Sequence, residues 1–542
     1  MIYYIDSING LDTNDGLTET TPLKTFDKFK VTEGYSILKH GDVIKIKRGS
    51  KFNDGTVRLY TQNGGRNIFP QVLITAYGAG EMPEFSAYNE LSKTALVSQG
   101  QNIYKADLTT LTDGFDTTNY NVGFIYDKVN DKIYGNRVFT QTFEENMDFY
   151  VDGSDLYVRI DDYSSLPDDL ILGISEIPFV CDSNLIVDSM HFTLSGRHGC
   201  ITTTENGCDN IEIRNCKFSK IGGALYQGTQ RFGNGFECYE LGKNIRVHNC
   251  VFDDIYDTPV TFQGVNGKFE DISFDHNFFK NCTMVFEGWI SGGDGIYNCR
   301  FSDNVAINVG YGFGNTHREL GRFVVYQPIA DVDHVDIKIE NNIFYNTKNS
   351  LFNIDNFAST DIKFNNNKYY AYSDCVILDE SQYTMANYQE YVNAMHQDEA
   401  SEFIVIDEDN KGKVLEEILI STTLQSDETT AHFEDESSPI VLNNEPVEVV
   451  AAQYGISIIA STFTPINRKT ALLKVIFSTT DARNAYDELV RIAFPTNSLN
   501  DQAFDDKFYI TRTSNTFFSL QCVQNLASGG QYTVSGIVVF NS

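Results

Sequence analysis

The sequence predicts an all-β protein, a right-handed parallel β-helix followed by a small C-terminal antiparallel β-sandwich. The main observation is a phrase that recurs seven times between residues 184 and 369, in which alternating apolar residues precede an Asn slot and a closing aromatic. Successive closing aromatics are 26, 34, 27, 22, 43 and 25 residues apart, a period that indicates a solenoid. These aromatics are Phe192, Phe218, Phe252, Phe279, Phe301, Phe344 and Tyr369.

Each copy of the phrase contains a strand and a bend. Apolar residues alternate, as in Ile211 and Ile213, which predicts a short strand with one buried face. The Asn slot suits a tight coil corner, and Asn stacked on Asn passes amide hydrogen bonds between coils. A β-sandwich with short strands is the alternative, but its hairpins favour Asn-Gly or Asp-Gly turns. The slot holds Ser189, Asn215, Asn249, His276, Asn298, Asn341 and Asn366.

The pattern divides the chain into five segments. Residues 1–114 are expected to form the first coils and their cap, 115–175 a β-rich insertion, and 176–406 the central β-helix with an end-capping helix and a return strand. Residues 407–438 are polar and acidic, which is typical of a linker. Longer alternating segments in residues 439–542 predict the β-sandwich, with a role in trimerisation or carbohydrate binding.

Charge and composition argue against several functions. The formal net charge of -33 disfavours nucleic acid and anionic membranes as partners, since both select a basic surface. No apolar run reaches spanning length and the N-terminus lacks a signal-peptide pattern, so neither membrane insertion nor an export signal is expected. Nine of ten cysteines lie in the solenoid without a CxxC spacing, which predicts buried fillers and argues against a zinc site. No cofactor is expected, whereas acidic clusters such as DVDHVD leave Ca²⁺ binding open.

The opening YYIDSINGLDTNDG, the stretch GDVIKIKRGSKF and the order of segments resemble bacteriophage tailspikes and capsule depolymerases of the right-handed, pectate-lyase-like β-helix class. The resemblance implies a homotrimer in the virion, attached to a phage tail or baseplate protein, that cleaves bacterial capsule, exopolysaccharide or O-antigen at the cell surface. Tailspikes often begin with a separate attachment domain, whereas the first coil here starts at Met1. A secreted bacterial polysaccharide enzyme is therefore the alternative.

A β-helix fills its lumen with side chains, so a ligand is expected on an outer face. One strand of each coil aligns as GFECYE, PVTFQG, MVFEGW, FVVYQ and SLFNID, which points Cys238, Phe262, Phe286, Val325 and Phe352 inward. The predicted outward column is Tyr239, Gln263, Glu287, Tyr326 and Asn353, beside Glu237 and Thr261. Trp289, the only Trp, follows on the same side. Aromatic faces and amides suit sugars, so the column predicts a glycan-binding track.

Glycoside hydrolysis needs two carboxylates. Glu237 and Glu287 are the first candidates, two coils and two residues apart in this alignment, with backbones ~10 Å or more apart. Side-chain reach brings such carboxyls toward the ~6.5–9.5 Å of an inverting pair. Glu240, Asp257 and Asp294 lie in adjacent turns as replacements for either member. An exposed Glu on a strand is also an ordinary solvated charge.

Two other functions fit the sequence. A lyase needs a base and a cation beside the substrate carboxylate, for which the sequence offers Arg197, His198, Arg231, His317 and Arg318. Of these, His198 and Arg231 are also candidates for substrate binding. The acidic chain disfavours a polyanionic substrate, so we rank hydrolase above lyase. A non-catalytic receptor-binding spike needs the aromatic column but no carboxylate pair.

Overall fold

The computed structural model describes residues 1–29, 38–39, 41–59, 71–111, 114–115, 120–202, 207–314, 321–328, 332–355 and 361–425, and eight strands between Val449 and Val539. The chain divides into two compact units. The first is residues 1–412 except 79–81, and the second comprises 79–81 and 413–542. No helix in these described ranges is long and apolar enough to cross a membrane.

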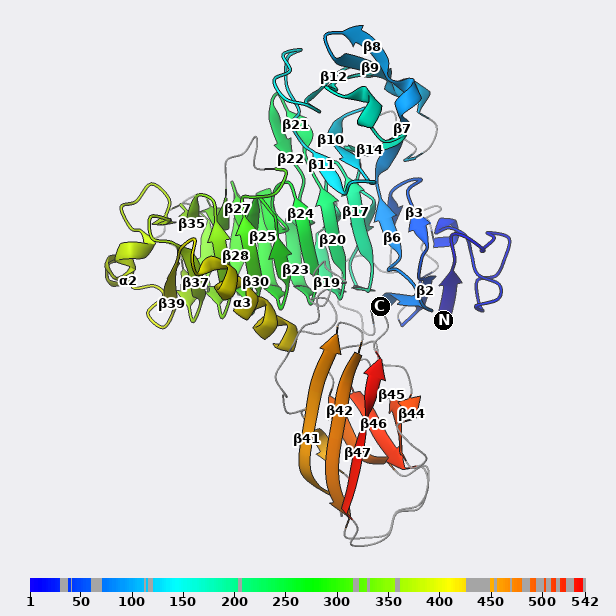
Figure 1. Cartoon of the computed structure of the whole chain (residues 1–542), viewed down its shortest axis with the longest axis vertical. Coiled ribbons are helices and arrows are strands. Elements are labelled where there is room, and N and C mark those ends of the chain that lie inside the picture. The colour runs from blue at the N-terminus through cyan, green and yellow to red at the C-terminus, as the bar shows by residue number, and fades with distance from the viewer. Residues whose placement is uncertain are drawn as a thin grey trace. The chain divides into compact units, whose positions relative to one another are not determined.

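The first unit is a parallel β-helix, as the sequence predicted (Figure 1). Strands of successive coils pair in parallel, and the apolar residues stack in register, as in Ile211, Ile245 and Ile272. Each coil contributes to three rows of strands, which we call rows one, two and three. Rows one and two belong to a 19-stranded sheet and row three is a 10-stranded sheet.

The strands are assigned to the rows as follows. Row one consists of β4 (Val57–Arg58), β15 (Phe179–Cys181), β18 (Cys200–Thr202), the first parts of β23 (Phe236–His248) and β25 (Val260–Asp275), β27 (Met284–Ile290), β31 (Arg322–Pro328), β35 (Ser350–Ile354) and β38 (Val376–Leu378). Row two consists of β1 (Ile2–Ile5), β2 (Val43–Lys47), β5 (Val72–Tyr77), β16 (Leu185–Asp188), β19 (Cys208–Arg214), the last parts of β23 and β25, β28 (Gly293–Tyr297), β29 (Arg300–Ser302), β32 (Asp333–Val335), β33 (Ile337–Glu340) and β36 (Ile362–Asn365). Row three consists of β3 (Lys51–Phe52), β6 (Glu84–Ser86), β17 (His191–Ser195), β20 (Lys217–Ile221), β24 (Val251–Ile255), β26 (Phe278–Lys280), β30 (Val305–Val309), β34 (Ile343–Thr347), β37 (Lys368–Tyr372) and β39 (Glu402–Ile406).

The predicted column of closing aromatics is present in row three, with one correction. Ala306, not Phe301, stands in register between Phe279 and Phe344. Phe301 lies on row two, where it pairs with Phe274. Its ring still enters the stack, 5.8 Å from the Phe279 ring and 6.3 Å from that of Phe344. The small side chain of Ala306 lets a ring from another row keep the aromatic stack continuous, which is why the sequence pattern looked unbroken.

The Asn slot makes the bend but not the hydrogen-bonded ladder. Asn215 and Asn341 have φ of 52° and 61°, the left-handed conformation that Asn tolerates. The amide ladder is formed one residue later by Asn277, Asn304, Asn342 and Asn367. Each side chain in it donates to the Oδ1 of the next at 3.1–3.2 Å. The sequence alignment placed Asn298 in the bend slot of its coil, and this was out of register with the structure. Asp303, with φ 58°, takes the bend position in that coil.

Eight of the nine cysteines of the solenoid are buried free thiols that fill the interior, and Cys375 is half-buried. Cys216 and Cys250 are fully buried at the ladder position of earlier coils, where the amides are absent. A small, weakly polar thiol fits a coil interior, as the sequence predicted.

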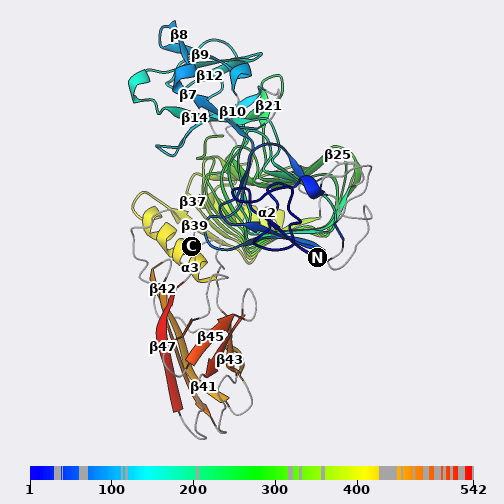
Figure 2. The ribbon, with the colours of Figure 1, turned by 90° about the vertical axis from the view of Figure 1, so that its right-hand side faces the viewer.

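An insertion with its own core interrupts the first coils (Figure 2). It starts at Tyr88 rather than at residue 115, because β7 pairs antiparallel with β14 outside the three rows. The insertion contains β7 (Tyr88–Ser92), β8 (Val97–Gly100), β9 (Ile103–Asp107), β10 (Val122–Asp127), β11 (Lys132–Tyr134), β12 (Phe149–Asp152), β13 (Asp155–Arg159) and β14 (Asp169–Ile174), with the 3-10 turns Lys93–Ala95, Leu108–Thr110 and Tyr163–Ser165.

The end of the β-helix carries the short helix α2 (Tyr388–Met395), preceded by a 3-10 turn at Met385–Asn387, and the return strand β39. Asp398 beside them is buried and accepts hydrogen bonds from the side chains of Tyr369, Tyr391 and Ser401. At the other end a 3-10 turn spans Asp27–Phe29.

Helix α3 (Lys411–Gln425) lies within the stretch that the sequence predicted to be a linker. Leu and Glu in it favour a helix more than the polar composition suggested. Residues 426–438 are outside the described part. The second unit has a five-stranded antiparallel sheet of β40 (Val449–Ala452), β43 (Glu488–Ala493), β46 (Phe517–Cys522), β45 (Phe508–Arg512) and β44 (Gln502–Ala503), and a three-stranded one of β41 (Ile456–Asn467), β42 (Thr470–Thr479) and β47 (Gln531–Val539).

Candidate functional site

Row one places Glu237 and Glu287 in a single column. Glu237 pairs with Thr261 on the next coil, and Thr261 pairs with Glu287 on the one after. The alignment had set Glu287 two residues away from this column. A slip of two residues keeps the same face, so Glu287 still points outward, as predicted. The two glutamates are therefore two coil rises apart, about 10 Å between their backbones.

Tyr326 was predicted to face outward, and this is wrong. β31 is aligned one residue differently, and a one-residue slip reverses every side chain of a strand. Val324 and Tyr326 therefore point inward, whereas Val325 takes the position after Glu287 in its column. Gly288 lies opposite Tyr326, and a Cβ there would come within 2.7 Å of its ring. Tyr326 is fully buried and its hydroxyl contacts Nδ1 of His334 at 2.8 Å, so it serves the core.

Glu237 lies at the start of β23 among buried polar partners. Only 2% of it is exposed, and its Oε2 lies 2.9 Å from His198 Nδ1 and accepts a 2.8 Å hydrogen bond from Asn234 Nδ2. Burial opposes ionisation of Glu237. The charge interaction with His198 and the hydrogen bonds from the side chains of His198, Gln263 and Asn234 outweigh it and hold the pKa of Glu237 below its usual value. Glu237 is therefore a carboxylate at neutral pH.

Glu287 has the opposite electrostatic environment. It is half-buried, and Thr261 Oγ1 donates to its Oε2 at 3.3 Å. Burial and the negative charge of Glu237 raise the pKa of Glu287 to about 7, against the smaller effect of the Thr261 hydrogen bond. Two carboxyls whose pKa values are pushed apart form the usual basis of an acid and base assignment.

A second outward column runs beside the glutamates. Tyr239, Gln263, Trp289 and Gln327 are in register on four successive coils, and each is half-buried. Three of the four were predicted as substrate-binding residues. Asn353, in the column of Glu287, accepts from Gln327 Nε2 at 3.3 Å and donates to Asp379 at 3.2 Å. The structure thus places aromatic, amide and carboxyl groups side by side on one face.

The other carboxylate candidates lie outside this pair. Glu240 has φ 65°, at an irregularity of β23, and its carboxylate accepts from the backbone N–H groups of Val265 and Asn266. It thereby ties one coil to the next. Asp257 is buried in the turn before β25. Asp294 is exposed and pairs with Lys268 at 3.2 Å.

Arg231 was predicted to bind substrate, and the structure contradicts this. It is buried, and its guanidinium donates to the carbonyl oxygens of Gly123, Gly135 and Gly223. His198 is also buried, so it reaches a substrate only through Glu237. Arg197 is half-buried over the Phe232 ring at 5.6 Å. His317 and Arg318 lie outside the described residues.

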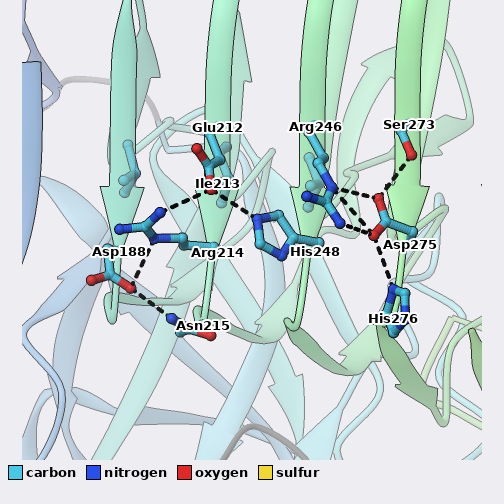
Figure 3. A network of polar contacts seen from close by, with 12 residues as sticks. Asp188, Glu212, Ile213, Arg214, Asn215, Arg246, His248, Ser273, Asp275 and His276 are labelled. Carbon is cyan, nitrogen blue, oxygen red and sulfur yellow. Dashed lines mark hydrogen bonds and ion pairs between the residues drawn. The ribbon is translucent and has the colours of Figure 1, made fainter. Parts of the chain in front are cut away.

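Another polar cluster lies on the outer face of row two (Figure 3). Glu212 contacts His248 and Arg214 at 3.0 Å each, while Asp275 is bound by Arg246 and His276. The hydrogen bond from His248 lowers the pKa of Glu212 to about 2. Although burial opposes it, hydrogen bonds from Arg246, His276 and Ser273 also hold the pKa of Asp275 well below normal. Both acids are held ionised by these partners, so neither is a protonated carboxyl at neutral pH.

Sequence reasoning missed Asn234 and the aromatic residues of a hairpin. Asn234 is three residues before Glu237 in the turn preceding the strand, a spacing without a recognisable motif. The hairpin consists of β21 (Ala224–Gln227) and β22 (Gln230–Phe232). Within the described ranges, no group of three or more His, Cys, Asp or Glu side chains is arranged to hold a metal ion.

Comparison with known proteins identifies no family. No family model and no curated protein matches the chain. Similar solved structures include the GH136 lacto-N-biosidase from Eubacterium ramulus, with 13% identity over 75% of this chain and 68% of that one at a TM-score of 0.36. XylC in complex with xylose shares 10% identity, covering 99% of this chain and 100% of that chain at a TM-score of 0.38. A tailspike mutant of E. coli bacteriophage HK620 in complex with a hexasaccharide shares 11% identity, covering 92% of this chain and 86% of that chain at a TM-score of 0.27. Similarity this low carries no argument about function.

Proposed function

We propose that the protein is an endo-acting glycoside hydrolase of polysaccharides, with Glu287 as general acid and Glu237 as general base. The observation that supports it most is the division of one carboxyl pair into two protonation states. The pKa of Glu287 is about 7, while that of Glu237 is below its usual value. A glycosidase needs one protonated and one ionised carboxyl across the scissile bond.

The geometry favours an inverting reaction. Glu287 gives its proton to the glycosidic oxygen as the bond to the anomeric carbon breaks, and Glu237 accepts a proton from the water that attacks this carbon. Two coil rises, about 10 Å at the backbone, leave room for that water, since inverting carboxyls are ~6.5–9.5 Å apart. Because Glu237 is only 2% exposed, it is better placed to activate a water than to bond to the sugar.

The experiment is an assay on capsular and lipopolysaccharide preparations from a strain panel, reading new reducing ends together with absorbance at 235 nm. We expect reducing ends without the absorbance. The Glu237→Gln and Glu287→Gln variants should lose turnover and keep binding. Trp289 is the only Trp and lies in the neighbouring column, so its fluorescence reports binding in the same protein. Binding without cleavage by the wild type would instead identify a receptor-binding spike.

A lyase is the second candidate, because His198 adjoins Glu237. It is less well supported, since His198 is buried and the donors of Arg231 are taken by backbone carbonyls. The appearance of 235 nm absorbance with the reducing ends would select this alternative.

We also propose, from the resemblance of the sequence, that the protein is a homotrimeric phage tailspike acting on the bacterial surface. The long solenoid with a terminal antiparallel β unit supports this assignment. Light scattering should give three times the chain mass of 61.1 kDa. A monomeric mass would favour the secreted bacterial enzyme.

A further inference from the structure

We propose that Tyr226, on the hairpin β21–β22, is a sugar-stacking residue of this site, and that the insertion holds it there. The inference rests on the proposed function, because it assigns a substrate contact to the same carboxyl pair. The ring of Tyr226 is 65% exposed, so it is free to contact a ligand.

Two series of neighbouring residues connect Tyr226 to Glu237. On one side, its ring is 5.4 Å from that of Phe232, which in turn is 5.1 Å from the imidazole of His198, the partner of Glu237. On the other side, Tyr226 lies near enough to Tyr239 to contribute, with burial and Glu240, to raising the pKa of that phenol. Tyr239 is two residues from Glu237 in the same strand, on the same face. The exposed ring is thus separated from the carboxylate by Phe232 and His198 on one side and by Tyr239 on the other.

The hairpin is fixed from the insertion. Asn121 donates from Nδ2 to the Leu225 carbonyl at 2.8 Å and accepts from the Leu225 N–H at 3.0 Å, directly beside Tyr226. The buried Arg231 joins the Gly223 carbonyl of the hairpin to the Gly123 and Gly135 carbonyls of the insertion. Both views show β21 next to β10 of the insertion (Figures 1 and 2). Asn121 is therefore a positioning residue for Tyr226.

The chemistry identifies the ligand class as an uncharged glycan. An exposed phenol ring stacks on the C–H face of a sugar, and its hydroxyl bonds to sugar hydroxyls. The ionised Glu237 would repel a uronic-acid unit bound beside it. A neutral sugar ring on Tyr226 would be held at the Glu237 end of the pair, with the rest of the chain extending past Trp289.

The test uses the full chain with a neutral glycan that the wild type cleaves in the panel assay. Tyr226→Ala should raise KM roughly tenfold with kcat changed by less than about threefold, whereas Tyr226→Phe should stay within about twofold. Asn121→Ala should raise KM in the same direction. The double variant should have the same KM as Tyr226→Ala alone, since Asn121 acts only through the ring that this variant has already lost. Tyr311→Ala, at another exposed tyrosine of the β-helix, is the control.

An unchanged KM in Tyr226→Ala, with an active wild type, would overturn this inference and leave the proposed function standing. Additive effects of Tyr226→Ala and Asn121→Ala would overturn the positioning role. If the wild type neither cleaves nor binds any glycan, the proposed function fails and this inference falls with it. Circular dichroism and thermal unfolding of each variant separate loss of binding from loss of folding.

Discussion

The Asn ladder inside the β-helix and the glutamate pair outside it are both made by stacking side chains on successive coils, but their polar atoms are treated differently. In the ladder, Asn304 donates to Asn342 and to the Phe274 carbonyl while accepting from Asn277. Each amide is satisfied by its neighbours. In the outer column, Glu237 has several donors, whereas Glu287 has the weaker Thr261 contact and a nearby negative charge.

The difference separates stability from reactivity. A buried amide with all its partners rigidifies the coil, because an unpaired one costs the full desolvation penalty. A carboxyl that is buried beside a like charge keeps its proton up to about neutral pH, so it can donate that proton in a reaction. The same repeat architecture thus supports both, and the choice of residue at each row decides which one results.

The largest expected effect concerns the outer pair. Glu287→Gln removes the proton that leaves with the sugar, so we expect kcat to fall about 100- to 10,000-fold while the protein stays folded. Reducing-end kinetics on a cleaved glycan measure it. Asp294→Asn is the control, because Asp294 is exposed and its carboxylate is in an exposed ion pair with Lys268. Activity of Glu287→Gln above a third of wild type would remove Glu287 from the mechanism.

The ladder should respond in stability instead. Asn304→Ala leaves the Phe274 carbonyl and the Asn277 N–H without their partners, so the free energy of unfolding should fall by about 2–4 kcal/mol. Asn353→Ala, on the half-buried outer column, should cost about 1 kcal/mol or less. Denaturant unfolding measures both. Equal costs would mean that position inside or outside the coil does not matter.

The pH dependence sharpens the contrast within the pair. The acid must be protonated, so kcat/KM should fall as pH rises through about 7, the pKa of Glu287. The base must be ionised, so the acidic limb should lie below the usual Glu value of about 4.3, because the pKa of Glu237 is lowered. A profile with no basic limb between pH 5 and 9 would contradict the assignment.

The smallest effect comes from the residue between the two glutamates. Thr261→Val removes the hydrogen bond that stabilises ionised Glu287. The basic limb of the pH profile should therefore move to higher pH, by less than about one unit. A shift to lower pH would show that Thr261 acts in another way.

The sequence was sufficient for the fold because coil spacing and alternation are local patterns. It also placed Glu237 and Glu287 on one face, since a two-residue slip preserves the side of a strand. It failed for Tyr326, where the slip was one residue, and for Arg231, whose partners Gly123 and Gly135 are about a hundred positions away in the chain. The ladder was missed by one residue, because the bend and the amide stack use adjacent positions, such as Asn341 and Asn342.

The most direct test needs no substrate. Titration of the Glu287 carboxyl carbon by NMR, in protein labelled with ¹³C-glutamate and assigned by loss of the signal in Glu287→Gln, should give a pKa near 7. In Glu237→Gln the like charge is gone, so the pKa should drop by about one unit or more. A Glu287 carboxyl that titrates near 4.3 in both proteins would contradict the acid and base pair on which the account depends.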